Sequence, residues 1–221
     1  MSSTVICISA SDGAHAEEVA TGVGQALGFR VINEEIVARA AAEAGVDQVA
    51  MEGVEQRKSV LLKLLDGLAA WGQTDPQFVL ASDAQITTQL AGVGVASAAA
   101  PPPSAELRGW IRTAIDEFVA DGDVVILAHA ASQSLAGRSQ VLRALVTASA
   151  PTRAARLADS LQIGTREAES LVKKGDAGRA DYLKRFYGID DERPTHYDIV
   201  VNTDQLTPAQ GAAAIVSLAT T

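Results

Sequence analysis

Residues 4–27 read TVICISASDGAHAEEVATGVGQAL, and this stretch decides the fold. Its first six residues form a near-continuous apolar run, which is typical of a strand covered on both faces of a sheet. The segment AEEVATGVGQAL (16–27) has apolar residues at helical spacing, and Gly28 follows it as a helix stop. The stretch therefore predicts a buried strand, a short turn and a helix.

The same alternation continues along the chain. Four further runs rich in Val, Ile or Leu predict buried strands: FRVI (29–32), VVILA (124–128), LRALVTA (142–148) and DIVVN (198–202). Helical patterns separate these runs, so we expect a three-layer α/β/α fold with a five-stranded parallel sheet. Ligands of such sheets bind beyond the carboxyl ends of the strands. The turn after TVICIS is expected at that edge.

The helical patterns complete the predicted organisation. Helices are predicted at residues 16–27, 34–45, 48–72, 75–95, 104–120, 151–161 and 208–219, with two more in 164–188 that part near Gly175. Residues 93–103 contain three consecutive prolines and predict a loop. A chain of 221 residues suits one domain, 1–221, with a helical insertion at 46–103.

Charge and composition argue against several classes of function. The formal net charge of −9 argues against general binding to nucleic acid or anionic membranes. No apolar stretch approaches the roughly 20 residues of a membrane-spanning helix, and the first residues lack a basic leader. The single cysteine, Cys7, lies in a predicted buried strand, which agrees with a cytoplasmic protein without a disulfide framework.

Positive charge gathers in the second half of the chain. Residues 138–193 hold eleven of the eighteen Lys and Arg residues but only eight of the twenty-seven Asp and Glu residues. Arg153 and Arg156 lie three positions apart, hence on one helical face, and Arg179 follows in the next basic stretch. Because a guanidinium donates paired hydrogen bonds to phosphoryl oxygens, these residues suit a small anion. Pairing with nearby aspartates on solvated helix faces is the alternative.

The turn after the first strand occupies the place of a phosphate-binding loop. Its residues are Ser11, Asp12, Gly13, Ala14, His15, Ala16 and Glu17. A working loop uses clustered glycines, whose N–H groups surround the phosphates, and a lysine. This turn has one glycine and no lysine, and Glu17 would repel a phosphate at the helix N-terminus. The residues alone leave open an eroded phosphate site and an ordinary strand–turn–helix connection.

Over nearly its whole length the chain resembles the cytidylate kinase-like family of P-loop nucleoside monophosphate kinases. The resemblance is carried by ICISASDGAHAEEVATGVGQALGFRVINEEIVARAA, LVTASAPTRAARLA and KKGDAGRADYLKRFYGIDDERPTHYDIVVNTDQLTPAQGAAAIV. In the last segment the matching places are Asp176, Arg179, Tyr182, Tyr187, Tyr197, Asp198, Asn202 and Thr203. The chain departs from the family pattern in the turn, where Glu17 replaces an arginine, and after the third strand, where Ala128-His129 replaces glycine–arginine.

The resemblance implies a set of roles. Residues 151–188 would form basic, lid-like helices, and residues 11–17 would hold ATP with Mg²⁺. Arg153, Arg156 and Arg179 would stabilise charge on the transferring phosphoryl group. A CMP-like acceptor would meet Asn33, His129 and Asp176; an N-cap role for Asn33 and simple polar lining for His129 are the alternatives. His15 and His129 without a third ligand make a poor metal site, so no site for a resident metal is expected.

Two functions follow from these observations. The first is a kinase that transfers a phosphoryl group from ATP to a CMP-like nucleotide, and the resemblance favours it. The second is a catalytically inactive protein of the same fold, acting as a nucleotide sensor or a protein-interaction partner, and the altered turn favours it. The long helices predicted at 48–95 would suit a homo-oligomer or a protein partner. A dinucleotide-binding dehydrogenase is a distant third, because the turn lacks G-x-G-x-x-G.

Overall fold

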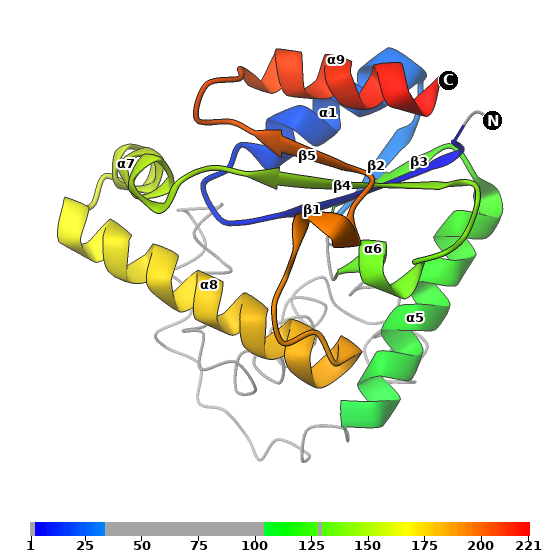
Figure 1. Cartoon of the computed structure of the whole chain (residues 1–221), viewed down its shortest axis with the longest axis horizontal. Coiled ribbons are helices and arrows are strands. Elements are labelled where there is room, and N and C mark those ends of the chain that lie inside the picture. Colours follow the sequence, from blue (N-terminus) through cyan, green and yellow to red (C-terminus); the bar gives the residue numbers. More distant parts are fainter. Residues whose placement is uncertain (1–2, 34–103, 128–129) are drawn as a thin grey trace, which may run out of the picture.

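The structure, a computed structural model, describes residues 3–33, 104–127 and 130–221. A five-stranded sheet forms the centre, and every neighbouring pair of strands is parallel (Figure 1). The strands are β1 (Val5–Ala10), β2 (Arg30–Ile32), β3 (Val124–Ile126), β4 (Val141–Thr147) and β5 (Ile199–Asn202). All five predicted strands and the predicted fold class are confirmed.

The register of the sheet places the carboxyl ends of its central strands together. The order across the sheet is β2-β3-β1-β4-β5, so β1 lies in the middle. Val5 of β1 pairs with Val124 of β3 on one side and with Val141 of β4 on the other. Because these strands run in the same direction, the turn after β1 and the segment after β4 emerge at one edge.

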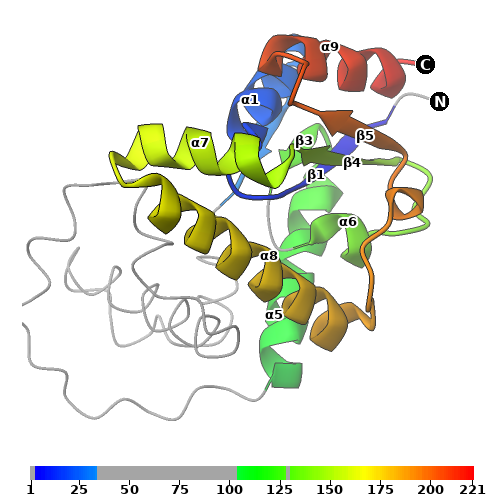
Figure 2. The same cartoon turned by 60° about the vertical axis from the view of Figure 1, so that its left-hand side comes forward.

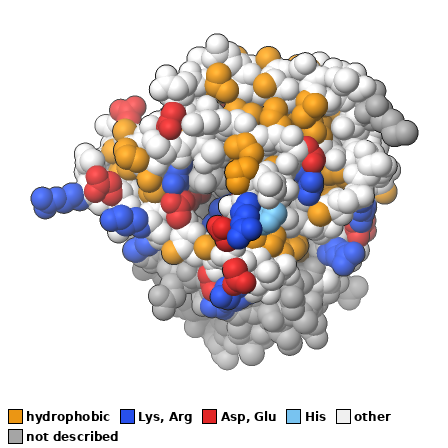
Figure 3. Space-filling model, in the orientation of Figure 1, with side chains coloured by type: hydrophobic (Ala, Val, Ile, Leu, Met, Phe, Trp, Pro, Cys, Tyr) orange, Lys and Arg blue, Asp and Glu red, His pale blue; other side chains and the backbone are white. Residues whose placement is uncertain are grey.

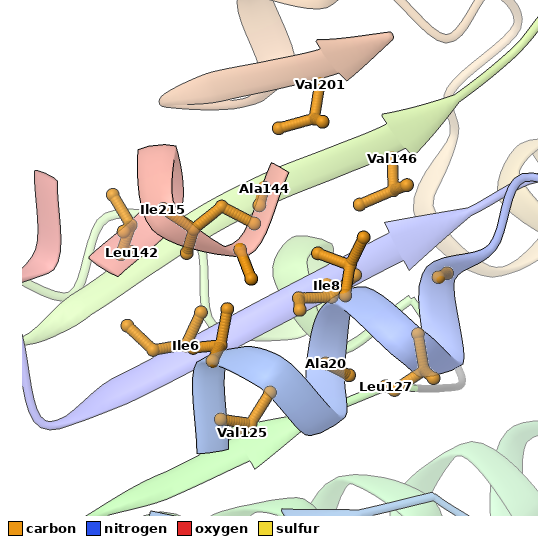
Figure 4. Packing of buried hydrophobic residues seen from close by; sticks show 14 of the residues in the cluster. Ile6, Ile8, Ala20, Val125, Leu127, Leu142, Ala144, Val146, Val201 and Ile215 are labelled. Carbon is orange, nitrogen blue, oxygen red and sulfur yellow. The ribbon is translucent and has the colours of Figure 1, made fainter. Parts of the chain in front are cut away.

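Helices cover both faces of the sheet. They are α1 (Ala16–Leu27), α5 (Ser104–Asp121), α6 (Ala131–Ser134) and α9 (Pro208–Ala219). Successive residues of a strand point to opposite faces. Ile6 and Ile8 of β1 accordingly pack with α1 and α9, as Figure 4 shows, whereas Val5 and Cys7 pack with α5 and α6. This burial on both faces explains why the strands read as continuous apolar runs.

Two further helices lie beside the carboxyl edge of the sheet (Figures 1 and 2). They are α7 (Ala150–Leu161) and α8 (Thr165–Tyr187), and a short 3-10 helix, η2 (Pro194–His196), leads into β5. Helices α7 and α8 pack on each other through Ala154, Ala168 and Val172. The predicted break near Gly175 is wrong, because one continuous helix runs through this residue. A glycine inside a helix costs only about 1 kcal/mol, which tertiary contacts readily offset.

Several predictions fall on residues outside the described ranges. They are the helical insertion at 46–103, the helices predicted between residues 34 and 95, and the position of His129. Within residues 3–33, 104–127 and 130–221, no helix is long and apolar enough to cross a membrane.

Candidate functional site

The turn between β1 and α1 has an unusual backbone. The Ala14 amide donates a hydrogen bond of 3.1 Å to the Ser11 carbonyl oxygen, which closes the turn. Gly13 and His15 have positive φ angles of 77° and 59°. Glycine adopts this conformation readily, but a residue with a Cβ atom is disfavoured there by about 1–2 kcal/mol. His15 therefore holds a strained conformation at the N-cap of α1.

Close packing against Arg153 is a second reason why glycine is required at position 13. A Cβ atom added to Gly13 would lie 2.8 Å from the carbonyl oxygen of Arg153 and 3.1 Å from the Arg153 Cα and Cβ atoms. The turn is thus packed directly onto the first residues of α7. Its path is fixed by a contact with the protein itself as well as by its own turn geometry.

Acidic side chains occupy the N-terminal turn of α1. Both Glu17 and Glu18 lie there, and they suit the positive end of the helix dipole. The His15 Nδ1 atom lies 2.6 Å from Glu18 Oε1. Burial acts to raise the pKa of Glu18. The hydrogen bond with His15, and a hydrogen bond between the Glu18 carboxylate and its own backbone, outweigh burial, so this pKa is lowered. A carboxylate therefore already sits where a phosphate would approach the helix.

Arg153 is almost completely buried beneath the turn. Its side chain is 6% exposed, and it makes a two-pronged ion pair with Asp176 of α8 at 2.8 and 3.0 Å. The guanidinium also donates to the carbonyl oxygens of Ala148 at 3.0 Å and Asp12 at 3.4 Å. Asp176 was expected to contact the CMP-like acceptor. The structure instead pairs it with Arg153, so that α7, α8 and the turn are held together.

Gly175 allows α8 to approach the turn closely. The Asp12 carboxylate packs against Gly175, and a Cβ atom added at that position would require the end of the Asp12 side chain to move. Burial raises the pKa of Asp12, and the negative charge of Asp176 adds to the rise, although Arg153 and Arg179 act against it. Gly175 therefore serves helix packing at this point and does not end the helix.

Arg156 connects the turn to the end of β5. Its Nη1 atom donates to the Gly13 carbonyl oxygen at 3.1 Å and to Thr203 Oγ1 at 3.0 Å, and its Nη2 atom donates to the Thr203 carbonyl oxygen at 2.6 Å. Thr203 is buried, and its hydroxyl also bonds to the Ala14 carbonyl oxygen at 3.0 Å. Arg156 thus ties the turn to the segment that follows β5.

Arg179 belongs to a polar network that runs from α8 to the sheet. It makes a two-pronged ion pair with Glu192 at 2.6 and 2.8 Å, and the Tyr197 hydroxyl donates to the same carboxylate. Burial acts to raise the pKa of Glu192, but the hydrogen bonds and charge of Arg179 outweigh it and lower this pKa. The side chain of Ser9, near the end of β1, is hydrogen-bonded with Tyr197. Its Oγ atom also lies 2.5 Å from the Oγ atom of Ser132.

A cavity of about 640 Å³ opens beside the turn. Its wall includes all of residues 11–17 and, from other elements, Asn33, Arg156 and Arg179. The structure therefore brings these sequence-predicted residues together. Arg153 and Asp176 are not among the described residues that line the cavity, because they face each other behind the turn. His129 lies outside the described residues, so its predicted place stays a prediction.

Residues 138–193, where positive charge gathers in the sequence, do not form a uniformly positive surface. Figure 3 shows Lys and Arg side chains intermingled with Asp and Glu on the face that carries α8. Exposed ion pairs such as Lys184 with Asp190 and Arg185 with Asp181 account for part of this pattern. Among the residues that the structure describes, no group of three or more His, Cys, Asp or Glu side chains is placed to hold a metal ion.

Some residues that shape the site were not singled out from the sequence. Glu192 and Ser132 are the clearest cases, since each is joined to its partner only by the tertiary fold. Thr203 and Tyr197 were recognised as matching places of a family pattern, but their contacts with Arg156 and with Glu192 were not anticipated.

A five-stranded parallel sheet covered by helices on both faces, with a strand–turn–helix at the carboxyl end of its central strand, defines a three-layer α/β protein. A model of the cytidylate kinase-like family matches residues 5–205, and the chain belongs to that family. The turn occupies the place of a phosphate-binding loop but lacks the clustered glycines and the lysine of such a loop.

Solved structures agree on the fold. An uncharacterized protein from Eubacterium ventriosum superposes with a TM-score of 0.61 at 14% identity, over 97% of each chain. The protein TT1252 from Thermus thermophilus superposes with a TM-score of 0.50 at 15% identity, over 99% of this chain and 98% of its own. No curated protein sequence matches the chain.

Proposed function

We propose that this protein binds a nucleoside monophosphate in the cavity beside residues 11–17 and does not transfer a phosphoryl group at the rate of a kinase. One observation carries the proposal. The three guanidinium groups expected to act on phosphate are already hydrogen-bonded to protein groups, Arg153 to Asp176, Arg156 to Gly13 and Thr203, and Arg179 to Glu192. In a transferring kinase such cations contact the moving phosphoryl group instead.

The charges of the cavity disfavour a magnesium-bound triphosphate. Among the residues that the structure describes, the cavity is lined by three carboxylates, those of Asp12, Glu17 and Glu18, and by two arginines. The turn has no lysine to neutralise the outer phosphates, and it has no Ser or Thr after such a lysine to hold Mg²⁺. The residues present therefore do not fit ATP with Mg²⁺. A monophosphate carries at most two negative charges and is repelled less.

A monophosphate has donors to meet in this cavity. The three hydrogen bonds of Arg156 use at most three of the five N–H donors of a guanidinium. The remaining N–H groups of Arg156, which lines the cavity, can therefore donate to a phosphate oxygen. A cavity of about 640 Å³ is also within the usual range for small ligands. Family membership makes cytidine monophosphate the first ligand to try.

Phosphoryl transfer from ATP with Mg²⁺ to a CMP-like nucleotide is the second candidate. Membership of the cytidylate kinase-like family favours it, and so does the presence of Arg156 and Arg179 in the cavity wall. It would require the ion pair of Arg179 with Glu192 to open during turnover. CMP-dependent consumption of ATP on the scale of one turnover per second would favour this candidate over binding alone.

Thermal and calorimetric titrations of the full chain with CMP, AMP and ATP, each with and without Mg²⁺, test the proposal. Binding should stabilise the protein by about 2.7 kcal/mol at a hundredfold excess of ligand over Kd. We expect this stabilisation from CMP and a smaller one from ATP, with no ATP consumed. Absence of stabilisation by every nucleotide would refute nucleotide binding and leave a scaffold role.

The variant Glu17→Arg sharpens the test. Glu17 is exposed and lines the cavity, so the substitution should leave the fold intact while changing the charge beside the ligand by two units. We expect CMP to bind about tenfold more tightly. Glu167→Arg is the matched control, because Glu167 is also an exposed acid in the first turn of a helix, α8, and is not among the described residues of the cavity wall. An equal gain in CMP affinity in both variants would show that the net charge of the protein, and not the charge beside the ligand, causes the gain.

A further inference from the structure

The two arginines in the wall of the cavity differ in the charge of their partners. Among the described residues, Arg156 donates to uncharged acceptors, the Gly13 carbonyl oxygen and the hydroxyl and carbonyl oxygens of Thr203. Arg179 is instead paired with the Glu192 carboxylate at 2.6 and 2.8 Å. The positive charge of Arg179 is therefore neutralised by a contacting group, whereas that of Arg156 is not.

The pair of Arg179 and Glu192 is held in one orientation. The side chains are 22% and 20% exposed, and the Tyr197 hydroxyl donates to the same carboxylate. Tyr197 is in turn hydrogen-bonded with the side chain of Ser9. Two parallel hydrogen bonds between a guanidinium and a carboxylate fix the plane of the guanidinium. The pair is thus a fixed unit without net charge in the wall of the cavity.

Arg179 has donors left over after these contacts. Its bonds to Glu192 and Tyr197 are made by the Nε and Nη2 atoms. The Nη1 atom carries two more N–H groups, and no residue that the structure describes accepts a hydrogen bond from them. These donors are open to a water-sized group, because in the described part of the chain only Gln133 has a side-chain N or O atom that is both closed to solvent and without a partner. A ligand in the cavity can therefore reach Nη1 of Arg179.

The two arginines suit different parts of one ligand. A phosphate on Nη1 of Arg179 would share its guanidinium with the Glu192 carboxylate, and the two negative charges would repel each other. A neutral acceptor, such as a carbonyl oxygen or a ring nitrogen, meets no such repulsion. Arg156 has no contacting carboxylate among the described residues, so it is the better partner for a phosphate.

We propose that Arg179 recognises the base of the nucleoside monophosphate, not its phosphate, and selects cytosine over uracil. The inference rests on the proposed function, because it places the base in the same cavity as the phosphate. Cytosine presents two neighbouring acceptors on its pairing edge, the ring nitrogen N3 and the carbonyl oxygen O2. Uracil carries an N3–H donor at that place, and a guanidinium has donors only. In a complex with uracil, a donor would face the donors of Arg179 and lose its partner.

Isothermal titration of the full chain with CMP, UMP and 3-deaza-CMP tests the inference without any substitution. CMP should bind about tenfold more tightly than UMP, as expected where an arginine reads the edge of a base. In 3-deaza-CMP a C–H group replaces N3 while the amino group of cytosine is kept. This analogue should bind about as weakly as UMP if N3 is read by Arg179. Equal affinities for CMP and 3-deaza-CMP would overturn the inference.

The variant Arg179→Lys places the same question on the protein. Lysine keeps the charge and can still pair with Glu192, but it lacks the planar guanidinium. We expect the ratio of the UMP and CMP dissociation constants to fall from about ten to about one, with UMP affinity unchanged. If Arg179 held the phosphate instead, both nucleotides would weaken alike and the ratio would persist, which would also overturn the inference. Arg185→Lys is the matched control and should change neither affinity, because Arg185 lies on the same helix, pairs with Asp181 and is not among the described residues of the cavity wall.

The titrations also separate this inference from the proposed function. If CMP and UMP bind with equal affinity, nucleotide binding in the cavity stands and base selection by Arg179 alone is refuted. If no nucleoside monophosphate binds, the proposed function and the inference fail together.

Discussion

Replacing Gly13 with alanine tests whether the turn after β1 is shaped by its contact with α7. Gly13 has a φ of 77°, and an added Cβ atom would lie 2.8 Å from the Arg153 carbonyl oxygen. The left-handed conformation disfavours alanine by about 1–2 kcal/mol. Overpacking against the backbone of Arg153 adds about 1–3 kcal/mol, since that atom is not the end of a flexible side chain. We therefore expect the free energy of unfolding to fall by about 2–5 kcal/mol.

Gly28→Ala provides the matched control for this prediction. Gly28 has nearly the same φ, 73°, but no atom lies within 4 Å of the place where its Cβ would be. Its replacement should cost only the conformational part, about 1–2 kcal/mol. Urea unfolding followed by circular dichroism gives both values, with equal m-values as the check that the denatured states match. Equal losses in the two variants would show that the turn does not press on α7 in solution, and the account of Gly13 would be wrong.

Three further predictions concern ionisable groups. Asp12→Asn should raise the free energy of unfolding at pH 7 but hardly at about pH 3. The pKa of Asp12 is raised in the folded protein, so this carboxyl makes the protein less stable as pH rises from 3.8 through the folded pKa; a pH-independent gain in urea unfolding would contradict this. Glu192→Gln should make the loss of stability in acid less steep. The lowered pKa of Glu192 contributes stability that is fully present above pH 4.5 and is lost as pH falls through the folded pKa; parallel pH profiles of thermal unfolding for the variant and the parent would argue against this. Burial raises the pKa of Cys7 to about 12, so the thiol of the native protein should resist a colorimetric thiol reagent at about pH 8 and react only after unfolding, and rapid reaction of the folded chain would show that β1 is accessible.

The strands could be read from the sequence because their physical cause is local. A parallel strand covered on both faces must be apolar at nearly every position, as in VICISA of β1, and a run of that kind needs no knowledge of its neighbours. The helix break expected near Gly175 fails for the opposite reason. Whether a glycine ends a helix or admits a neighbour depends on what approaches it, and here the neighbour is Asp12, far away in the sequence.

The arginines of the site show the same limit. Their positions could be predicted, because residue spacing places Arg153 and Arg156 on one face of a helix near the carboxyl edge. Their ion-pair partners could not be predicted from spacing. Asp176 lies three residues from Arg179 yet pairs with Arg153, while Arg179 reaches across to Glu192. The choice between these carboxylates is made by the packing of α7 on α8, which no local pattern encodes.

Gly13 illustrates why a surviving loop glycine is weak support for phosphate binding. The same residue is required by the backbone of the turn and by its contact with Arg153, so its presence would be explained even if no ligand ever bound. Positions whose side chains face the cavity discriminate better. Glu17 is exposed there and also suits the N-terminus of α1, so its charge reports on the ligand once the helix-dipole effect is matched by the control Glu167→Arg. A gain of CMP affinity in Glu17→Arg, with no greater loss of stability than in Glu167→Arg, would therefore argue for a phosphate in the cavity more directly than any loss caused by altering Gly13.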